Sequence, residues 1–159
     1  DGAHVEATRQ IFNYYIAHSN ATPERQERSV AEHARDISDC LAAYVAEDTS
    51  DVVGFAFAKP FAKGLESFDP AVEFGVYLRA GEGGYGTGSL LVRRVIEDMR
   101  NCPKHSGIAK IDAGNIASIK LFKKLGFKEA ARLHEIGEKR GKRVTVVYMQ
   151  VMLQPDGGA

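Results

Sequence analysis

VEFGVYLRAGEGGYGTGSLLVRRVIEDM, residues 72–99, contains three different local patterns in succession. Residues 72–78 alternate with the period of a strand, which places Glu73, Gly75 and Tyr77 on one face. Residues 83–88 contain four glycines. Apolar residues then return at helical spacing: Leu91, Val92, Val95, Ile96 and Met99. The stretch therefore predicts a strand, a glycine loop and a helix that begins near Ser89.

The glycine loop is a candidate site for a diphosphate. Glycine lets backbone N–H groups approach a ligand without a Cβ in the way, and a helix N-terminus adds unpaired donors and about half a positive charge. A Walker A loop is excluded because no Lys-Ser or Lys-Thr follows it. In a dinucleotide-binding βαβ unit this loop would lie near the start of the fold, whereas three expected strands precede it here, which disfavours such a unit. A flexible loop without a ligand remains an alternative.

Upstream of this stretch the pattern changes from helices to strands. Residues 6–18 have a helix-like pattern, and Thr22-Pro23-Glu24 reads as the start of a second helix that runs to about Asp39. Strands are expected at residues 41–47 and 52–61, joined by the turn formers of residues 48–51. Residues 60–70 are expected to be a loop.

Downstream, one helix and two strands complete the fold. Residues 105–111 are a weak strand candidate. Residues 115–125 form a short helix that Gly126 ends, and residues 144–153 form a long apolar strand. Without repeats or a linker, residues 1–159 are expected to form a single domain of the α+β class, built on a mixed sheet.

Composition narrows the range of partners. The chain has no net charge, but residues 1–79 hold 7 Lys/Arg against 13 Asp/Glu and residues 80–159 hold 14 against 8. A cationic C-terminal half suits a small polyanion better than nucleic acid, whose readers are usually basic overall. No apolar run is long enough to span a bilayer, so no membrane association is expected. Cys40 and Cys102 lack metal-ligand spacing, which predicts free thiols in a reducing cytoplasm and no metal.

Two motifs together resemble those of a known family. GGYGTG, residues 83–88, resembles the coenzyme A pyrophosphate loop of the GNAT N-acetyltransferases, and NIASIKLFKKLGF, residues 115–127, resembles that family's later motif. Within the family, the phosphinothricin acetyltransferase branch is the most similar. IFNYYIAHSNAT (residues 11–22) resembles the first helix and loop of that branch, and VEFGVYL (72–78) resembles its central strand. IGEKRGKR (136–143), followed by YMQ (148–150), resembles its C-terminal hairpin.

The resemblance covers residues 5–150 and implies the GNAT fold, a mixed, mostly antiparallel central sheet flanked by helices. It also implies acetyl transfer from acetyl-CoA to the amine of a small, amino-acid-like substrate by direct attack. Because an alkyl amine with a pKa near 10.4 is mostly protonated at neutral pH, a base is needed, and Glu73 stands where this branch places its carboxylate base. The branch commonly forms dimers, so a homodimer is a further expectation.

The resemblance also assigns roles to other residues. A backbone N–H near Val76 or Tyr77 would hold the thioester oxygen as negative charge develops. Apart from the resemblance, Tyr77 or Tyr85 could donate a proton to the departing thiolate from another direction. The coenzyme would contact Val76, Leu78, Gly83, Gly84, Tyr85, Gly86, Thr87, Gly88, Asn115, Ser118 and Phe122. The substrate would contact Phe61, Lys63, Phe68 and Arg143. For Glu73 the alternative is a solvated strand face, and for Asn115 it is a plain helix N-cap.

Several positions depart from the family pattern. Gly83 replaces the usual Arg or Gln of the loop, and Phe122 replaces a Tyr or His that would act as general acid. The substrate loop reads FAKGLESF, residues 61–68, and Arg143 stands where Trp is common, so the branch's own substrate is not carried over. Lys63 could replace an Arg there, as a point charge. The family's first strand is missing: either it has been lost or the sheet begins at residues 41–47.

Two other functions remain open at this point. A peptide N-terminal acetyltransferase would need an open groove instead of a closed pocket. A catalytically impaired GNAT-like module would bind coenzyme A as a sensor or scaffold, which Phe122 favours and Glu73 disfavours.

Overall fold

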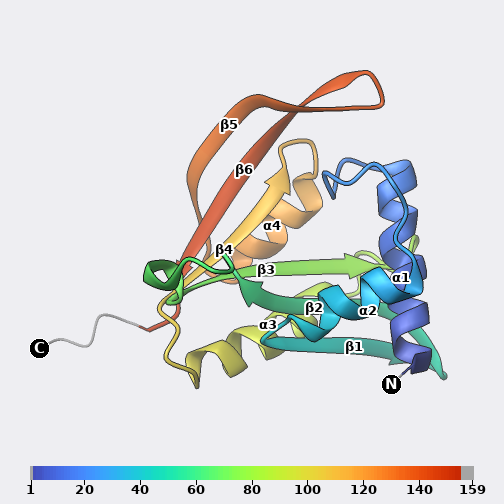
Figure 1. Cartoon of the computed structure of the whole chain (residues 1–159), viewed down its shortest axis with the longest axis horizontal. Coiled ribbons are helices and arrows are strands. Elements are labelled where there is room, and N and C mark those ends of the chain that lie inside the picture. Colours follow the sequence, from blue (N-terminus) through green and yellow to red (C-terminus); the bar gives the residue numbers. More distant parts are fainter. Residues whose placement is uncertain (1, 155–159) are drawn as a thin grey trace, which may run out of the picture.

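The fold is built on one six-stranded sheet in the order β1-β2-β3-β4-β6-β5 (Figure 1). The structure is a computed structural model that describes residues 2–154. The strands are β1 (Ala42–Asp48), β2 (Asp51–Pro60), β3 (Ala71–Leu78), β4 (Ser106–Asp112), β5 (Lys128–Lys139) and β6 (Lys142–Met152). Among the strand pairs of residues 2–154, only β3 and β4 run parallel. The expected mixed, mostly antiparallel sheet is confirmed.

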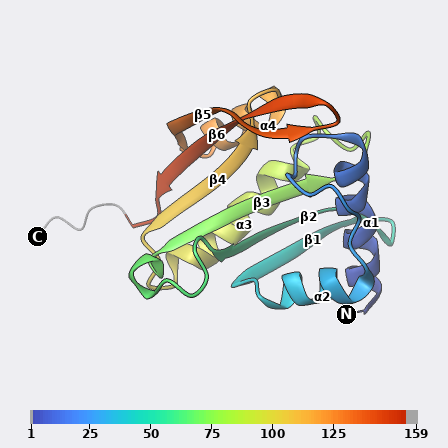
Figure 2. The ribbon, with the colours of Figure 1, turned by 45° about the horizontal axis from the view of Figure 1, so that its top comes forward.

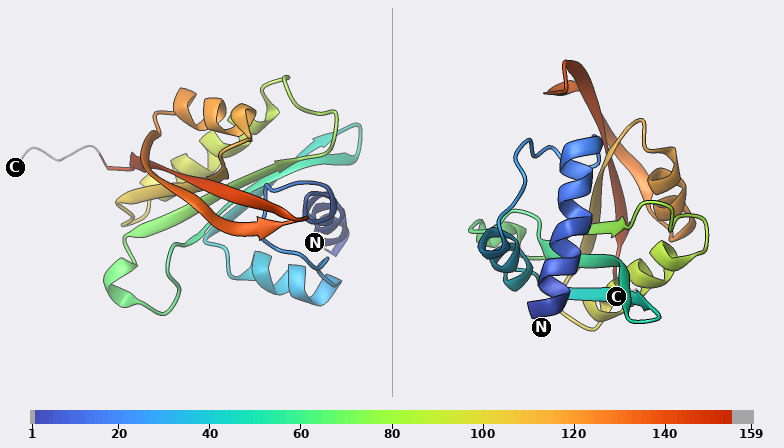
Figure 3. Two further views of the ribbon diagram at one scale, coloured as in Figure 1. Left: turned by 90° about the horizontal axis from the view of Figure 1, so that it is seen from above. Right: turned by 90° about the vertical axis from the view of Figure 1, so that its right-hand side faces the viewer.

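Helices cover both faces of the sheet, as the right panel of Figure 3 shows. Helices α1 (Gly2–His18) and α2 (Val30–Ser38) lie on one face, where α1 contacts β2 and β3. Helices α3 (Thr87–Arg100) and α4 (Ile116–Lys124) lie on the other, where α3 contacts β1, β2 and β3. A short 3-10 turn (Glu66–Phe68) interrupts the loop before β3. Among the described residues both α1 and α2 precede β1, which is the first strand within residues 2–154.

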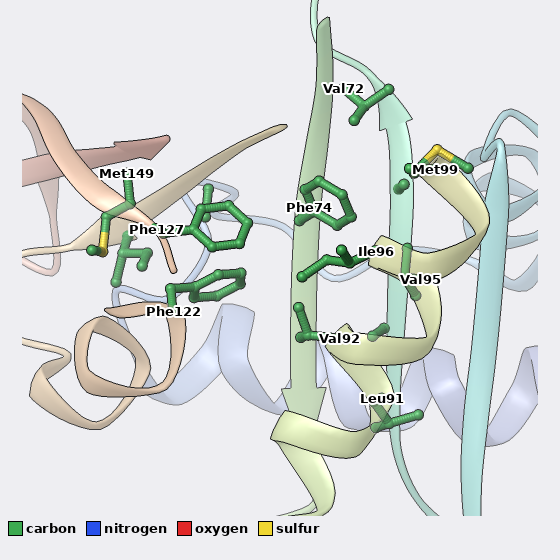
Figure 4. Packing of buried hydrophobic residues seen from close by; sticks show 14 of the residues in the cluster. Val72, Phe74, Leu91, Val92, Val95, Ile96, Met99, Phe122, Phe127 and Met149 are labelled. Atoms are coloured by element: carbon green, nitrogen blue, oxygen red, sulfur yellow. The ribbon is translucent and has the colours of Figure 1, made fainter. Parts of the chain in front are cut away.

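Two hydrophobic clusters sit on opposite faces of the sheet. The larger one lies under α3 and α4; it joins Val92, Val95 and Met99 of α3 to Phe74 of β3 and reaches Phe122 and Phe127 (Figure 4). The smaller one joins α1 to β2 and is largely aromatic. Because side chains alternate along β3, Phe74 lies on the face of the larger cluster, whereas Glu73, Gly75 and Tyr77 lie on the face toward α1 and α2.

The predicted start of the second helix is wrong. Helix α2 begins at Val30 after Ser29, whose side chain accepts from the Glu32 backbone N–H while the Glu32 carboxylate accepts from the Ser29 backbone N–H. This reciprocal capping box satisfies two donors at the start of the helix. Thr22 is instead 2% exposed in the preceding loop, where its carbonyl accepts a hydrogen bond from Lys139.

Strand β5 was not predicted from residue pattern, although the resemblance had implied a hairpin at residues 136–143. Ten of its twelve residues are exposed, because β5 lies at the edge of the sheet and packs chiefly against β6, with no helix of residues 2–154 covering either face. Without a buried face there is no alternation of apolar and polar residues to detect. The other predicted elements lie within a few residues of their expected bounds.

Buried His33 couples stability to pH. Its side chain is fully buried; Nε2–H donates to Thr8 Oγ1 at 3.0 Å, since the Thr8 hydroxyl itself donates to the His4 carbonyl. Nδ1 has no hydrogen-bond partner among the described residues. Burial lowers the pKa of His33 below its usual 6.5, because the charged ring would lose its hydration.

We therefore expect His33 to reduce stability in acid. The unfolded chain takes up the proton near pH 6.5 and the folded chain only below that, so the free energy of unfolding should fall as the pH drops through 6.5. Urea unfolding at pH 7.5 and 5.5 measures this loss, and a His33→Leu variant should lose less between the two. An identical loss in both proteins would contradict the prediction.

Candidate functional site

The sheet opens between its two parallel strands. The ladder of β3 and β4 contains only Ala71↔Ser106, Val72↔Gly107 and Glu73↔Ile108. Beyond Glu73, β3 stays paired with β2 as far as Leu78, whereas β4 stays paired with β6 as far as Asp112. The facing edges of the two strands are therefore not paired with each other over this length, which leaves room for a ligand between them.

A cavity of about 660 Å³ lies at this opening. That volume falls within the range of small-molecule sites. Its walls come from the α1–α2 loop, the strands β2, β3 and β4, the start of α4 and the β5–β6 hairpin. The lining includes Glu24, Arg28, Lys59, Glu73, Gly75, Val76, Tyr77, Lys110, Asp112, Asn115, Ser118, Phe122, Lys139 and Tyr148.

Glu73 is the acidic residue at the point where the strands separate. It lies opposite Lys59 in the register of β2 and β3, and its side chain is 19% exposed. Its carboxylate forms an ion pair with Lys110 of β4, with Nζ and Oε2 3.0 Å apart. The same ammonium lies 5.1 Å from the centre of the Phe61 ring. Glu73 is thus in the cavity and held by a cation, and does not lie on an open, solvated strand face.

Tyr77 is anchored in an aromatic cluster. Its ring stacks on Phe55 at 5.5 Å and meets Phe12 edge-on at 4.9 Å, and its hydroxyl donates to the Ala21 carbonyl at 3.4 Å. Burial and the nearby Glu73 carboxylate raise the pKa of Tyr77 above its usual 10. The raised pKa makes this hydroxyl a weak proton donor, so its placement favours packing over the predicted acid role.

Gly75 lets an aromatic ring pass close to the strand beside Glu73. A Cβ built at Gly75 would lie 2.3 Å from Cζ of Phe57, so any larger residue would force that ring to move. The ring of Phe57 stacks toward Tyr77 at 6.4 Å and also lines the cavity. The glycine therefore shapes the floor between Glu73 and Tyr77.

The predicted glycine loop leads into α3 with its backbone accessible. Gly84 and Gly86 adopt left-handed φ values of 88° and 83°, which glycine tolerates best. Gly86 is the N-cap residue of α3 and supplies no side-chain acceptor, so the first N–H groups of the helix are left available. Gly88 is different: a Cβ there would lie 2.8 Å from Leu121 and near Val76 and Leu78. This contact ties the start of α3 to α4 and the end of β3.

The predicted coenzyme residues of α4 line the cavity. Asn115 is the N-cap residue: its Oδ1 accepts from the Ser118 backbone N–H at 3.2 Å, which leaves its amide group able to donate. Phe122 is 2% exposed and packs edge-to-face on Phe127 at 4.9 Å (Figure 4). Phe122 thus serves the core and meets the cavity with one edge. Tyr85, which lies in the predicted glycine loop and not in α4, is 79% exposed.

The predicted substrate residues do not line this cavity. Phe61 reaches it only through its contact with Lys110. Lys63 is exposed and pairs with Asp39 at 2.8 Å, Phe68 is 52% exposed, and Arg143 lies 3.9 Å from Glu138 on the surface. Their assignment to the substrate remains a prediction that the cavity does not support.

Sequence reasoning missed the wall opposite the sheet. Arg28, in the α1–α2 loop, lies over the Phe12 ring at 4.0 Å, pairs with Asp36 at 2.9 Å and also pairs with Glu24. The hairpin tip closes on this loop (Figure 2), where Lys139 donates to the Thr22 carbonyl at 2.7 Å and Arg25 donates to the Glu138 carbonyl at 2.7 Å. This loop was not predicted, because Thr22-Pro23-Glu24 had been interpreted as the start of the second helix, whereas α2 begins only at Val30.

Lys110 was missed as well. The available signal was the alternation of β4, which puts Lys110 on the face opposite the buried Ala109 and Ile111. What could not be read from the sequence is that β4 runs beside β3 and brings this lysine to Glu73.

Residues 2–154 contain neither a metal-binding cluster nor a membrane-spanning helix. No cluster of three or more His, Cys, Asp or Glu side chains is arranged to hold a metal ion in that part of the chain. Over the same range, no helix has the length and apolar character needed to cross a bilayer. Cys40 and Cys102 are free thiols.

Comparison with known proteins points to one family. The family model described as "Acetyltransferase (GNAT) family" matches residues 9–127. The chain is 30% identical, over 96% of its length and 91% of the relative's, to an L-methionine sulfoximine/L-methionine sulfone acetyltransferase of Salmonella typhimurium.

Two solved structures share the fold over nearly the whole chain. A GNAT superfamily phosphinothricin acetyltransferase from Sinorhizobium meliloti, in complex with AcCoA, has a TM-score of 0.92 and 25% identity over 99% of this chain and 91% of its own. A ribosomal-protein-alanine N-acetyltransferase from Brucella melitensis has a TM-score of 0.88 and 30% identity over 96% of each chain.

Proposed function

Because the chain belongs to the GNAT family of acetyltransferases, we propose that it moves an acetyl group from acetyl-CoA to the amine of a small amino-acid-like substrate. The relative from Salmonella typhimurium is named for two such substrates, methionine sulfoximine and methionine sulfone. The observation that carries the proposal is the cavity at the β3–β4 opening, with Glu73 in its lining.

The chain fits coenzyme A at the glycine loop. No heavy atom lies within 4 Å of the Cβ positions built at Gly83, Gly84 and Gly86, so a diphosphate can approach the backbone closely. The uncapped start of α3 adds N–H donors and the positive end of the helix dipole. When bound, acetyl-CoA supplies the acetyl group as a thioester. The side-chain amide of Asn115 and the edge of Phe122 would face the coenzyme from α4.

The chain's own residues would supply the remaining chemistry. Glu73 would accept the proton that an ammonium group must lose before its nitrogen can attack. A backbone N–H of β3 beyond Glu73, at Val76 or Tyr77, would donate to the oxygen on which negative charge develops. The ring of Phe57 and the aromatic cluster around Tyr77 would exclude water from the reacting centre.

Among the alternatives, acetylation of a peptide N-terminus is favoured by one observation, the structural similarity to the ribosomal-protein-alanine N-acetyltransferase. The contact of the hairpin tip with the α1–α2 loop favours a small acceptor, because it joins two walls of the cavity and narrows the space that a peptide would need. Glu73 disfavours a binding module without activity, because a module that only binds coenzyme A would not need an ion-paired carboxylate inside the cavity.

The proposal is tested by thiol release from acetyl-CoA with a panel of amino acids, simple amines and a short peptide with an N-terminal alanine. Fast release with one or more free amino acids supports it. Release with the peptide alone would support the peptide N-terminal acetyltransferase. Binding of acetyl-CoA without release for any acceptor would support the binding module.

The organisation of the protein is also part of the proposal. We propose that residues 1–159 form a single domain and act in the cytoplasm as a homodimer, without a metal. The free thiols of Cys40 and Cys102 suit a reducing compartment. The long exposed edge strand β5, with Leu133 and Ile136 on its surface, offers a face for a second copy. Light scattering measures the molar mass of the protein in solution, which distinguishes a dimer from a monomer.

A further inference from the structure

One of the two residues that form the ion pair inside the cavity has no role in the proposed reaction. Glu73 and Lys110 come from adjacent strands, and their charged atoms lie 3.0 Å apart at the point where β3 and β4 separate. Glu73 is the proposed base. Lys110 has no place in proton transfer from the substrate, yet its ammonium group lies beside the base.

Two other cations of the cavity are already engaged by the chain. Arg28 is held by Glu24 and Asp36, and Lys139 is bonded to the Thr22 carbonyl. Lys59 lies opposite Glu73 in the strand register and has no ion pair within residues 2–154. The charges beside Glu73 are therefore one cation paired with it and a second cation that lacks an acidic partner.

This arrangement is the electrostatic complement of an α-amino acid. Such a molecule carries an ammonium and a carboxylate on the same carbon, so the two charges must lie within a few ångströms of each other. An ammonium group placed on Glu73 brings the carboxylate to the neighbouring cations. We propose that Lys110 binds the α-carboxylate of the acceptor, with Lys59 adding positive potential, and that this pair selects amino acids over other amines. The inference rests on the proposed function.

Lys110 is free enough to make this exchange. About a third of its side chain is exposed (34%), and its other contacts are the faces of the Phe61 and Tyr148 rings, at 5.1 and 5.8 Å. A partly exposed ion pair contributes little to stability. A zwitterion that enters between the two side chains replaces one ion pair by two, so neither charge is left without a partner.

The test compares three acceptors that differ only at the carboxylate: L-methionine sulfone, its primary carboxamide and 3-(methylsulfonyl)propylamine. The parent protein should prefer the free acid. In Lys110→Met, kcat/KM for the acid should fall by about 10- to 100-fold, mainly through KM, as expected for the loss of one charged hydrogen bond. For the carboxamide and the amine it should change by less than about threefold. Lys110→Arg should restore most of the preference.

Controls separate this role from a structural one. Lys128→Met removes the same charge from the exposed start of β5, outside the cavity, and should leave the preference unchanged. Thermal unfolding of Lys110→Met checks the fold, and Lys110→Gln provides a second variant. An equal fall for all three acceptors would overturn the inference, because Lys110 would then only position Glu73. A parent protein that acetylates the carboxamide as well as the acid would overturn it too.

Failure of the proposed function has a different signature. If the parent protein binds acetyl-CoA but releases no thiol with any of the three probes or the wider panel, the proposed function is wrong and the inference falls with it. Activity on simple amines without any preference for the acid would leave the acetyltransferase in place and remove only the role of Lys110.

Discussion

Replacing Glu73 by Gln should lower kcat by about 10²- to 10⁴-fold, the usual contribution of a positioned general base. The amide keeps the shape of the side chain but cannot accept the proton of the substrate ammonium. Because Glu73 lies in the cavity, away from the glycine loop, affinity for acetyl-CoA should stay unchanged. Steady-state thiol release gives the turnover and calorimetry gives the coenzyme affinity.

A matched change tests whether the effect belongs to this carboxylate. Glu129→Gln makes the same substitution on the exposed strand β5, where Glu129 pairs with Arg132, and should leave turnover intact. Full activity of Glu73→Gln would show that the ion pair with Lys110 is its only role. Loss of acetyl-CoA binding in this variant would show that the carboxylate supports the fold instead of the reaction.

Replacing Gly83 by Asp should weaken acetyl-CoA binding by on the order of 10²-fold. A carboxylate beside the diphosphate would add like charge where the helix dipole and the backbone donors now favour an anion. Gly83 suits this test because a Cβ there meets nothing within 4 Å and its φ lies outside the left-handed region. Calorimetry with acetyl-CoA measures the affinity.

Other glycines of the loop give less direct answers. Gly86→Asp would strain a backbone with φ of 83°, and Gly88→Asp would push against Leu121, so both should abolish binding, but through strain or a clash as well as through charge. The matched control is Gly83→Asn, which has the shape of Asp without its charge and should bind within about threefold of the parent. The Asp effect should shrink as salt is raised. Equal binding by the Asp and Asn variants would remove the loop from the diphosphate site.

Local sequence patterns were sufficient where an element carries its own signal. The alternation of residues 72–78 predicted β3 and the face of Glu73, and the spacing of Leu91, Val95 and Met99 predicted α3. Asn115 and Gly126 marked the ends of α4, because a side-chain acceptor and a left-handed glycine satisfy helix termini from within the chain. Each of these features depends on residues a few positions apart, so the sequence by itself determined them.

The composition of the site was decided only by tertiary structure. The capping box at Ser29 and Glu32 displaced the expected helix start at Thr22, and the freed loop could then meet the β5–β6 hairpin more than a hundred residues away. Strand β5 left no signal because its residues face solvent. Lys110 meets Glu73 because two strands run in parallel for three residue pairs and then separate. Contacts of this kind depend on how distant segments pack, and no local pattern in the sequence encodes them.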